Sequence, residues 1–223
     1  MIATSSESVH APRRVLRTRN AGWARGLARF LARRGVRPNT VSVASVAFAC
    51  ASAAAFWLSA ALGPAGRAAL LLVAAACIQL RLLCNLLDGM LAVEEGMKSG
   101  AGEIFNDLPD RLADVLILVG AGCAVRHVPH GATLGWAAAV LAVFTAYVRV
   151  LGGSLGLTQH FIGPMAKQHR MFTLTVVTLV AAIEALLRMP PRAVVAGLLV
   201  IVAGSIATAV RRTGRILREA RGR

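Results

Sequence analysis

Long apolar segments alternate with short polar breaks along most of this 223-residue chain. Six such segments lie near 40–62, 67–92, 104–125, 133–155, 171–188 and 193–210. Each is close to the ~20 residues that an α-helix needs to cross the hydrocarbon core of a bilayer. Several breaks contain residue pairs that end helices, namely Gly63-Pro64, Gly163-Pro164 and Pro190-Pro191. The pattern predicts an all-α integral membrane protein whose six transmembrane helices occupy residues 37–212.

The chain before the first apolar segment has a different character. Residues 1–20 are rich in Ser, Pro and Arg and predict a disordered basic arm. In residues 21–36, apolar side chains recur at helical spacing, at Trp23, Leu27, Phe30 and Leu31. Arginines follow every fourth position on another stripe, at Arg25, Arg29 and Arg33. We expect an amphipathic interfacial helix on an anionic membrane, because a solvated basic helix would leave the aromatic stripe exposed.

The composition agrees with a membrane protein and indicates its surroundings. Hydrophobic residues make up 57% of the chain and charged residues 16%, compared with roughly 45–50% and about 25% in soluble domains. The net charge of +15 favours anionic membrane lipids over nucleic acid as partners, because basic clusters beside membrane spans bind lipid headgroups. The four cysteines lie in apolar runs and have neither metal-ligand nor redox spacing.

Lysine and arginine are unevenly divided between the two sets of helix ends. The segment before residue 38 and the basic tail at 213–223 are arginine-rich, and the same side carries Lys98, Arg111, Lys167 and Arg170. The opposite loops offer only Arg67, Arg126, Arg188 and Arg192. Since positive charge is retained on the cytoplasmic side, both termini are expected there. The arginine and alanine usage indicates a multi-pass protein of a bacterial inner membrane.

Acidic and amide side chains gather on one face of the second and third predicted helices. At ~100° per residue, the second helix aligns Arg81, Asn85, Asp88, Gly89 and Ala92. The third aligns Glu103, Asn106, Asp107, Asp110 and Asp114. Acids at membrane depth are costly and usually functional, and a divalent cation with oxygen ligands compensates them. The alternative is an ion-pair network with Arg81, Arg111 or Arg149 that serves only packing, although buried pairs add little net stability.

Eight of these positions resemble a known signature. CDP-alcohol phosphotransferases, also called CDP-alcohol phosphatidyltransferases, carry D-x2-D-G-x2-A-R-x8-G-x3-D-x3-D. With every gap kept, the corresponding residues here are Asn85, Asp88, Gly89, Ala92, Val93, Gly102, Asn106 and Asp110. Three positions depart from it, because Asn85 and Asn106 replace acids and Val93 replaces the arginine.

The resemblance implies the chemistry of that family. A phospho-alcohol unit, such as phosphatidyl from CDP-diacylglycerol, would pass to an alcohol acceptor with release of CMP, in a homodimer that uses Mg²⁺ or Mn²⁺. The implied metal ligands are Asn85, Asp88, Asn106 and Asp110, and the implied general base is Asp110. Glu103 and Asp107 are candidates to restore the charge lost at the two asparagines.

Other stretches resemble the family's substrate contacts. The stretch Pro38-Asn39-Thr40-Val41-Ser42 resembles its Pro-Asn-x-x-Thr/Ser opening, although it equally suits a plain helix start. The implied substrate-binding set is Pro38, Asn39, Thr40, Gly89, Ala92, Gly102, Arg111, Arg149, Lys167 and Arg170. The last three cations slightly favour a phosphorylated acceptor such as glycerol 3-phosphate, and inositol phosphate is equally compatible. The alternative function is a catalytically weak relative that binds CDP-lipid or metal without turnover.

Overall fold

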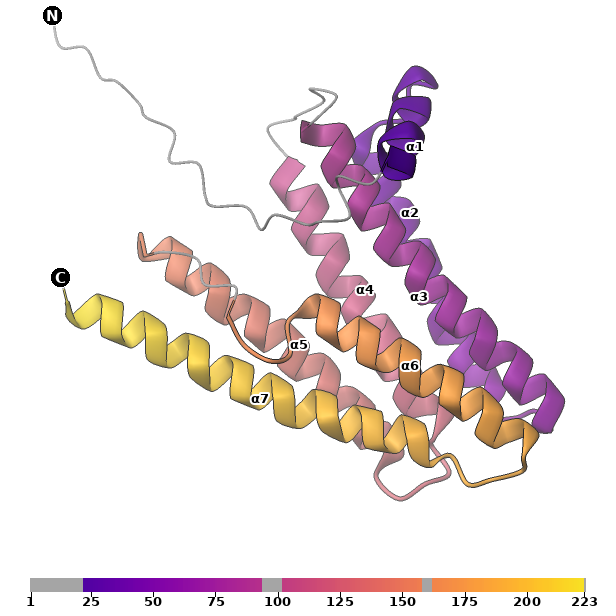
Figure 1. The fold of residues 1–223 in the computed structure, drawn as a ribbon. Coiled ribbons are helices and arrows are strands. Elements are labelled where there is room, and N and C mark those ends of the chain that lie inside the picture. Colours follow the sequence, from indigo (N-terminus) through magenta and orange to yellow (C-terminus); the bar gives the residue numbers. More distant parts are fainter. Residues whose placement is uncertain (1–21, 94–101, 158–161, 223) are drawn as a thin grey trace, which may run out of the picture.

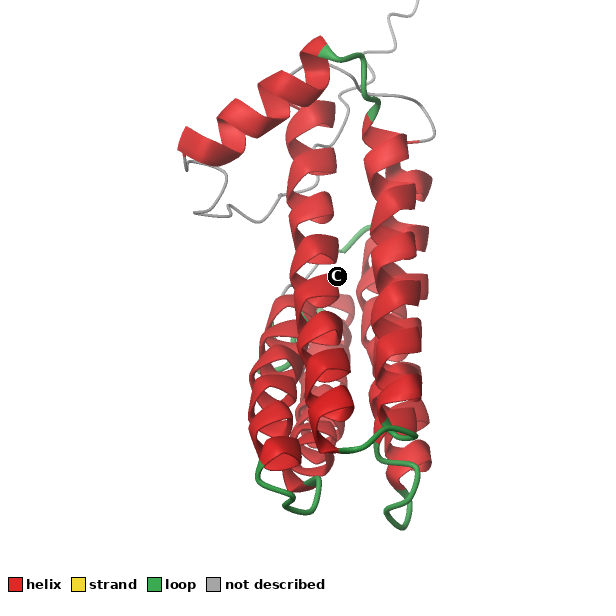
Figure 2. Cartoon of the chain, turned by 90° about the vertical axis from the view of Figure 1, so that its right-hand side faces the viewer, coloured by secondary structure: helices red, strands yellow, loops and turns green. Residues whose placement is uncertain are grey.

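The chain folds into long helices that lie beside one another. The computed structural model describes residues 22–93, 102–157 and 162–222 (Figure 1). Those ranges contain helices and no strand (Figure 2). The helices are α1 (Gly22–Arg33), α2 (Pro38–Ser59), α3 (Pro64–Val93), α4 (Gly102–Ala124), α5 (Gly131–Ser154), α6 (Lys167–Leu186) and α7 (Arg192–Arg221). Each of the six apolar segments therefore corresponds to one helix, α2 to α7, within a few residues at most ends.

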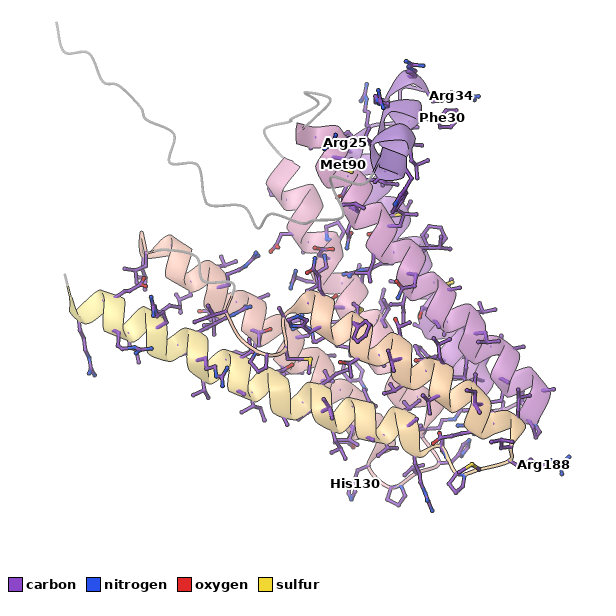
Figure 3. All side chains as sticks on the ribbon, viewed as in Figure 1. Arg25, Phe30, Arg34, Met90, His130 and Arg188 are labelled. Atoms are coloured by element: carbon purple, nitrogen blue, oxygen red, sulfur yellow. The ribbon has the colours of Figure 1, made fainter. Side chains whose placement is uncertain are left out.

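The chain reverses direction at each connection between α2 and α7 (Figure 1). Helix α2 packs on α3 and α4, α4 packs on α5, α3 packs on α6, and α7 covers α5 and α6. As a result, the second half of α3 and the first halves of α4 and α6 lie at the same end of the bundle. His130 and Arg188 mark the opposite end (Figure 3).

Five helices in the described part of the chain are long and apolar enough to cross a membrane: α2, α3, α5, α6 and α7. Helix α4 is not among them, because its first half carries Asp107, Asp110, Arg111 and Asp114. Five of the six expected spans thus have the length and apolar composition that crossing a membrane requires, and the count of six stays a prediction. Helix α7 continues past the expected end at 210 to Arg221.

Small residues allow the helices to approach closely. A Cβ atom added to Gly120 of α4 would lie 2.6 Å from the Cα of Ala53 in α2. A Cβ atom on Gly122 would lie 2.7 Å from the Cα of Gly135 in α5. Close approach of this kind is the usual way in which membrane helices gain packing energy, since burial from water does not drive their association.

Helix α1 is amphipathic, but its apolar stripe does not act as one unit. Leu27 and Leu31 pack toward the cluster that includes Leu87 and Met90 of α3. Trp23 and Phe30 are 60% and 51% exposed. The guanidinium of Arg34 lies 5.1 Å from the centroid of the Phe30 ring (Figure 3), which is within cation–π range. One part of the stripe therefore docks α1 on the bundle, and the other part faces outward.

Candidate functional site

The predicted polar residues of four helices converge at one end of the bundle. Asn85 and Asp88 lie in the last turns of α3, and Asp110 lies in the first half of α4. Arg149 lies near the end of α5, and Lys167 opens α6. The antiparallel connections place these residues at one level although the sequence separates them widely. Lys167 and Arg170 belong to the first turn of α6 and not to a preceding loop.

Asp88 of α3 lies where α3 packs against α2. The residue is 4% exposed, and the Ser42 hydroxyl of α2 donates a hydrogen bond of 2.7 Å to its Oδ2 atom. Its Oδ1 atom is buried, and no described residue donates a hydrogen bond of ordinary geometry to it. The Asn85 amide nitrogen, one turn earlier, is also buried without an acceptor in the described part of the chain. Unsatisfied buried polar groups are rare and call for an explanation, such as an absent ion.

Asp110 contacts cations from three helices. Arg81 Nη2 of α3 lies 3.3 Å from Oδ1 of Asp110 and donates to its backbone carbonyl at 3.0 Å. Lys167 Nζ of α6 donates to Oδ2. Arg111 Nη2 is more distant, 3.8 Å from Oδ2. Asp110 also interacts electrostatically with Asp88, which places both motif aspartates in one site.

Asp114 lies one turn deeper in α4 and is fully buried. Its Oδ1 accepts a hydrogen bond of 2.8 Å from Arg81, and its Oδ2 accepts one of 3.0 Å from Arg170. Arg170 also donates to the Met165 carbonyl at 3.0 Å and to the Thr145 hydroxyl at 3.3 Å. The ion-pair network that the sequence left open as an alternative is therefore present, and it links α3, α4, α5 and α6.

Two further arginines border the site. Arg149 Nη2 donates to Oδ1 of Asp107 at 2.9 Å. Arg212 of α7 is 6% exposed and donates to the carbonyls of Thr145 at 2.7 Å and Ile162 at 3.0 Å. Cations outnumber carboxylates among the described side chains here: Arg81, Arg111, Arg149, Lys167, Arg170 and Arg212 against Asp88, Asp107, Asp110 and Asp114. Such an excess favours a ligand that carries negative charge.

Neither Ser42 nor Arg212 was predicted from the sequence as a site residue, and the pairing of Arg81 with Asp114 was not predicted either. A signal existed for Ser42, because it occupies the last position of the Pro-Asn-x-x-Ser opening. For Arg212 the signal was misleading, since Arg211 and Arg212 together mark the end of an apolar run. Its burial arises because α7 continues beside α5.

Some predicted residues are placed only in part. Pro38 and Asn39 are half-buried at the start of α2, and Thr40 is exposed. Gly89 and Ala92 lie in the last turns of α3. Gly102, Glu103 and Asn106 belong to α4, but the side chains of Glu103 and Asn106 lie outside the described residues, as do Lys98 and the side chain of Val93. Their proposed roles stay predictions.

The residues present offer a partial fit to a divalent cation. Within the described ranges, no group of three or more His, Cys, Asp or Glu side chains is arranged to hold a metal ion. The unpaired Oδ1 of Asp88 is nevertheless the kind of oxygen that Mg²⁺ and Mn²⁺ prefer. The Asn85 amide can present its oxygen if the group is turned, since its nitrogen and oxygen are assigned from hydrogen bonds.

Comparison with solved structures finds matches, whereas no family model and no curated protein sequence matches this chain. Among solved structures, phosphatidylinositol phosphate synthase from Mycobacterium tuberculosis with CDP-DAG bound matches with a TM-score of 0.75. The chain shares the fold of this synthase. The match has 20% sequence identity and covers 88% of this chain and 94% of the synthase chain.

The same synthase in other states matches similarly. Its complex with manganese and citrate gives a TM-score of 0.74 at 20% identity, covering 87% of this chain and 88% of that one. Its apo form gives 0.71 at 20% identity, covering 86% and 95%. The synthase is a CDP-alcohol phosphotransferase, the family whose signature the sequence resembles. At this identity the likeness concerns the fold, and activity needs its own argument.

Proposed function

We propose that this protein is a membrane-embedded CDP-alcohol phosphatidyltransferase of phospholipid biosynthesis. The observation that carries the proposal is the position of Asp88 and Asp110. They are motif aspartates, and they lie close enough to interact electrostatically at one end of a fold shared with a synthase that was solved with CDP-DAG. The donor would be a CDP-alcohol lipid such as CDP-diacylglycerol, and the products would be a phosphatidyl alcohol and CMP.

The site residues divide the work between ligand binding and proton transfer. Asp88 would hold Mg²⁺ or Mn²⁺. The amide oxygens of Asn85 and Asn106 would add ligands, as would any oxygen lone pair of Asp110 that its cation contacts leave free. That ion, when bound, neutralises charge on the pyrophosphate. The acceptor hydroxyl oxygen attacks the phosphorus that carries the lipid alcohol, the bond from this phosphorus to the CMP oxygen breaks, and the hydroxyl proton passes to Asp110. Each carboxylate oxygen has two lone pairs, so the contacts with Arg81 and Lys167 leave Asp110 able to accept a proton.

The surrounding cations support an acceptor that carries a phosphate group. Arg149, Lys167 and Arg170 come from α5 and α6. They donate to Asp107, Asp110 and Asp114 of α4, respectively. Guanidinium groups bind phosphate through paired hydrogen bonds, so a polyol phosphate such as glycerol 3-phosphate or inositol phosphate suits this side. Arg111 and the start of α2, at Pro38 to Thr40, would line the nucleotide.

The proposed setting is a bacterial inner membrane with both termini in the cytoplasm. Anionic lipids would surround the basic residues of α1. The proposed homodimer would use an apolar face on α4 and α5, where Trp136 and Val115 border two apolar cavities of about 300 and 430 Å³. Disulfide trapping of Trp136→Cys in nanodiscs tests this face, and a lack of cross-linked dimer would count against it.

The alternative is a relative that binds CDP-lipid or metal without turnover. Asn85 and Asn106 favour it, because each removes a negative charge from the metal site.

The deciding experiment is CMP release by the purified protein in lipid nanodiscs. The assay contains CDP-diacylglycerol, Mg²⁺ or Mn²⁺, and a pool of polyol and polyol phosphate acceptors. We expect acceptor-dependent CMP that Asp110→Asn abolishes, and dividing the pool then identifies the acceptor. If the wild-type protein binds CDP-lipid but releases no more CMP than Asp110→Asn, the binding function replaces the enzyme.

A further inference from the structure

Arg81 is a buried cation inside the acidic site. Its side chain is fully buried, and it lies seven residues before Asp88 on α3. Seven residues make two helical turns, so both side chains lie on one face, about 10 Å apart along the helix axis. Arg81 therefore approaches the site from the depth of the bundle, and Asp88 lies toward its end.

Contacts with α4 fix the position of this guanidinium. Its Nη2 atom is 2.8 Å from Oδ1 of Asp114, 3.3 Å from Oδ1 of Asp110 and 3.0 Å from the Asp110 carbonyl. Asp114 is in turn held by Arg170 of α6. Asp114 thus acts as a positioning residue that keeps Arg81 against Asp110.

Burying the Arg81 guanidinium in this way costs free energy that a purely structural contact would not require. The Nε and Nη1 atoms of Arg81 are buried without an acceptor in the described part of the chain. A buried ion pair contributes little stability compared with apolar packing, and an incompletely bonded one contributes less. An apolar side chain would fit between α3 and α4 at lower cost, which suggests that the charge of Arg81 has a functional use.

The charge also changes the metal chemistry of the site. Asn85 and Asn106 have already removed two negative charges, and Arg81 and Lys167 pair with the Asp110 carboxylate. Arg81 lies about 10 Å from Asp88 along the helix axis. In a poorly screened interior, a fixed cation at that distance repels a divalent ion bound at Asp88. We propose that Arg81, held by Asp114, is a fixed cation that replaces a second metal ion, so that each chain binds one divalent cation, through Asp88. This inference rests on the proposed function only in taking a divalent cation as the ligand.

The test counts Mn²⁺ ions by electron paramagnetic resonance, with protein in nanodiscs and no nucleotide. We expect one Mn²⁺ per wild-type chain, and an affinity reduced about tenfold or more in Asp88→Asn, which loses the anionic ligand. Arg81→Gln should bind the ion about tenfold more tightly, or take up a second ion, because the repelling charge is gone. Arg81→Lys keeps the charge and should match the wild type within about threefold.

Three results would overturn the inference: two ions or none per wild-type chain, no change in Arg81→Gln, or an equal change in Arg81→Lys. If Arg81→Gln does not fold, Lys167→Gln decides, since it removes the other cation on Asp110 and should also tighten Mn²⁺ binding. CMP release by the same wild-type preparation keeps the two proposals apart. Absence of CMP with one Mn²⁺ per chain rejects the enzyme alone, and CMP with two ions per chain rejects this inference alone.

Discussion

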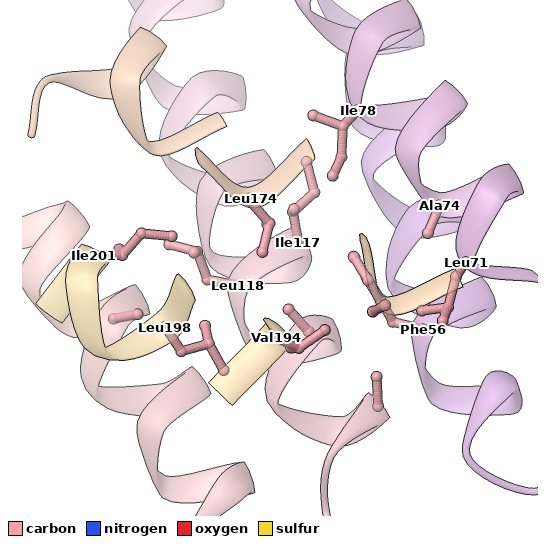
Figure 4. Packing of buried hydrophobic residues seen from close by; sticks show 14 of the residues in the cluster. Phe56, Leu71, Ala74, Ile78, Ile117, Leu118, Leu174, Val194, Leu198 and Ile201 are labelled. Carbon is pink, nitrogen blue, oxygen red and sulfur yellow. The ribbon is translucent and has the colours of Figure 1, made fainter. Parts of the chain in front are cut away.

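The two halves of α3 differ in what they bury. In the half that begins at Pro64, Leu71 and Ile78 pack against apolar side chains of neighbouring helices, such as Phe56 and Ile117 (Figure 4). In the other half, the same helix buries Arg81 and Asp88. The first half stabilises the bundle through close packing. The second half places charges where they cost stability, and that cost indicates function.

Helices α4 and α6 repeat this division. Ile117 and Leu118 of α4 and Leu174 of α6 belong to the apolar cluster, whereas Asp114 and Arg170 pair with one another nearer the site. A single rigid helix therefore connects each packed residue to a charged one. We expect changes in the apolar half to affect stability alone. Changes in the charged half should affect activity, and they should also cost stability where they leave a buried charge unpaired.

The sharpest contrast is expected at Asp88. The Asp88→Asn substitution should reduce CMP release about 1,000-fold or more, because the metal-binding carboxylate is lost. The thermal midpoint should change little, since Asn can still accept the hydrogen bond from Ser42. Turnover and thermal unfolding in nanodiscs measure the two effects.

Ser42→Ala is the matched control. It removes the hydroxyl that donates to Asp88 and that also lies 3.2 Å from the Pro38 carbonyl of its own helix, so a loss of about tenfold in turnover is expected. If both variants lose activity equally and also unfold early, the charged half is structural and the comparison fails.

The next largest effect concerns the buried pair at Asp114. Asp114→Leu removes the carboxylate that pairs with both Arg81 and Arg170, and we expect a loss of about 3 kcal/mol in stability. The double substitution Arg81→Met, Asp114→Leu removes both charges and should recover much of that loss while activity stays low. Denaturant or thermal unfolding of the single and double variants measures the coupling. A double variant no more stable than Asp114→Leu alone would contradict the pairing.

The sequence was sufficient for the helices because their signals are local. Each apolar run has the length of one helix, and pairs such as Gly63-Pro64 end it within a few residues. The acidic faces were also predictable, since 3.6-residue periodicity alone aligns Asn85 with Asp88 and Asp107 with Asp110 and Asp114. The position of Asp110 and Lys167 at the same end of the bundle was predictable only because successive helices alternate in direction, so that α4 and α6 begin at the same end.

The pairing across helices was not predictable, because it depends on which helices are neighbours. Arg81 meets Asp114, and Asp114 meets Arg170, because α3 packs on α6 and also contacts α4. Nothing in the sequence around Arg81 states this. The stripe on α1 divides for the same reason: Leu27 faces α3, whereas Trp23 at the same spacing does not.

A smaller effect is expected in the apolar half, at the close approach of α4 to α2. In Gly120→Ala the new methyl group would lie 2.6 Å from the Cα of Ala53, so the helices must separate. We expect a destabilisation of about 2 kcal/mol, typical of overpacking.

The matched control is Gly214→Ala in α7, where an added Cβ meets no atom within 4 Å. There the better helix propensity of alanine should stabilise the protein by up to about 1 kcal/mol. Equal thermal midpoints for both variants would show that α2 and α4 do not approach as closely as described.

The smallest effect is expected at α1, where the two parts of the stripe can be separated. Trp23→Ser should change stability in detergent by about 0.5 kcal/mol or less, because Trp23 is 60% exposed. The position of Trp23 relative to the membrane is more informative than its contribution to stability. In a Trp57→Phe, Trp136→Phe background, Trp23 is the remaining tryptophan, and its fluorescence should be quenched by brominated anionic lipids if α1 lies at the interface. Unquenched emission would place this side of α1 in water, and α1 would then be only a packing element on α3.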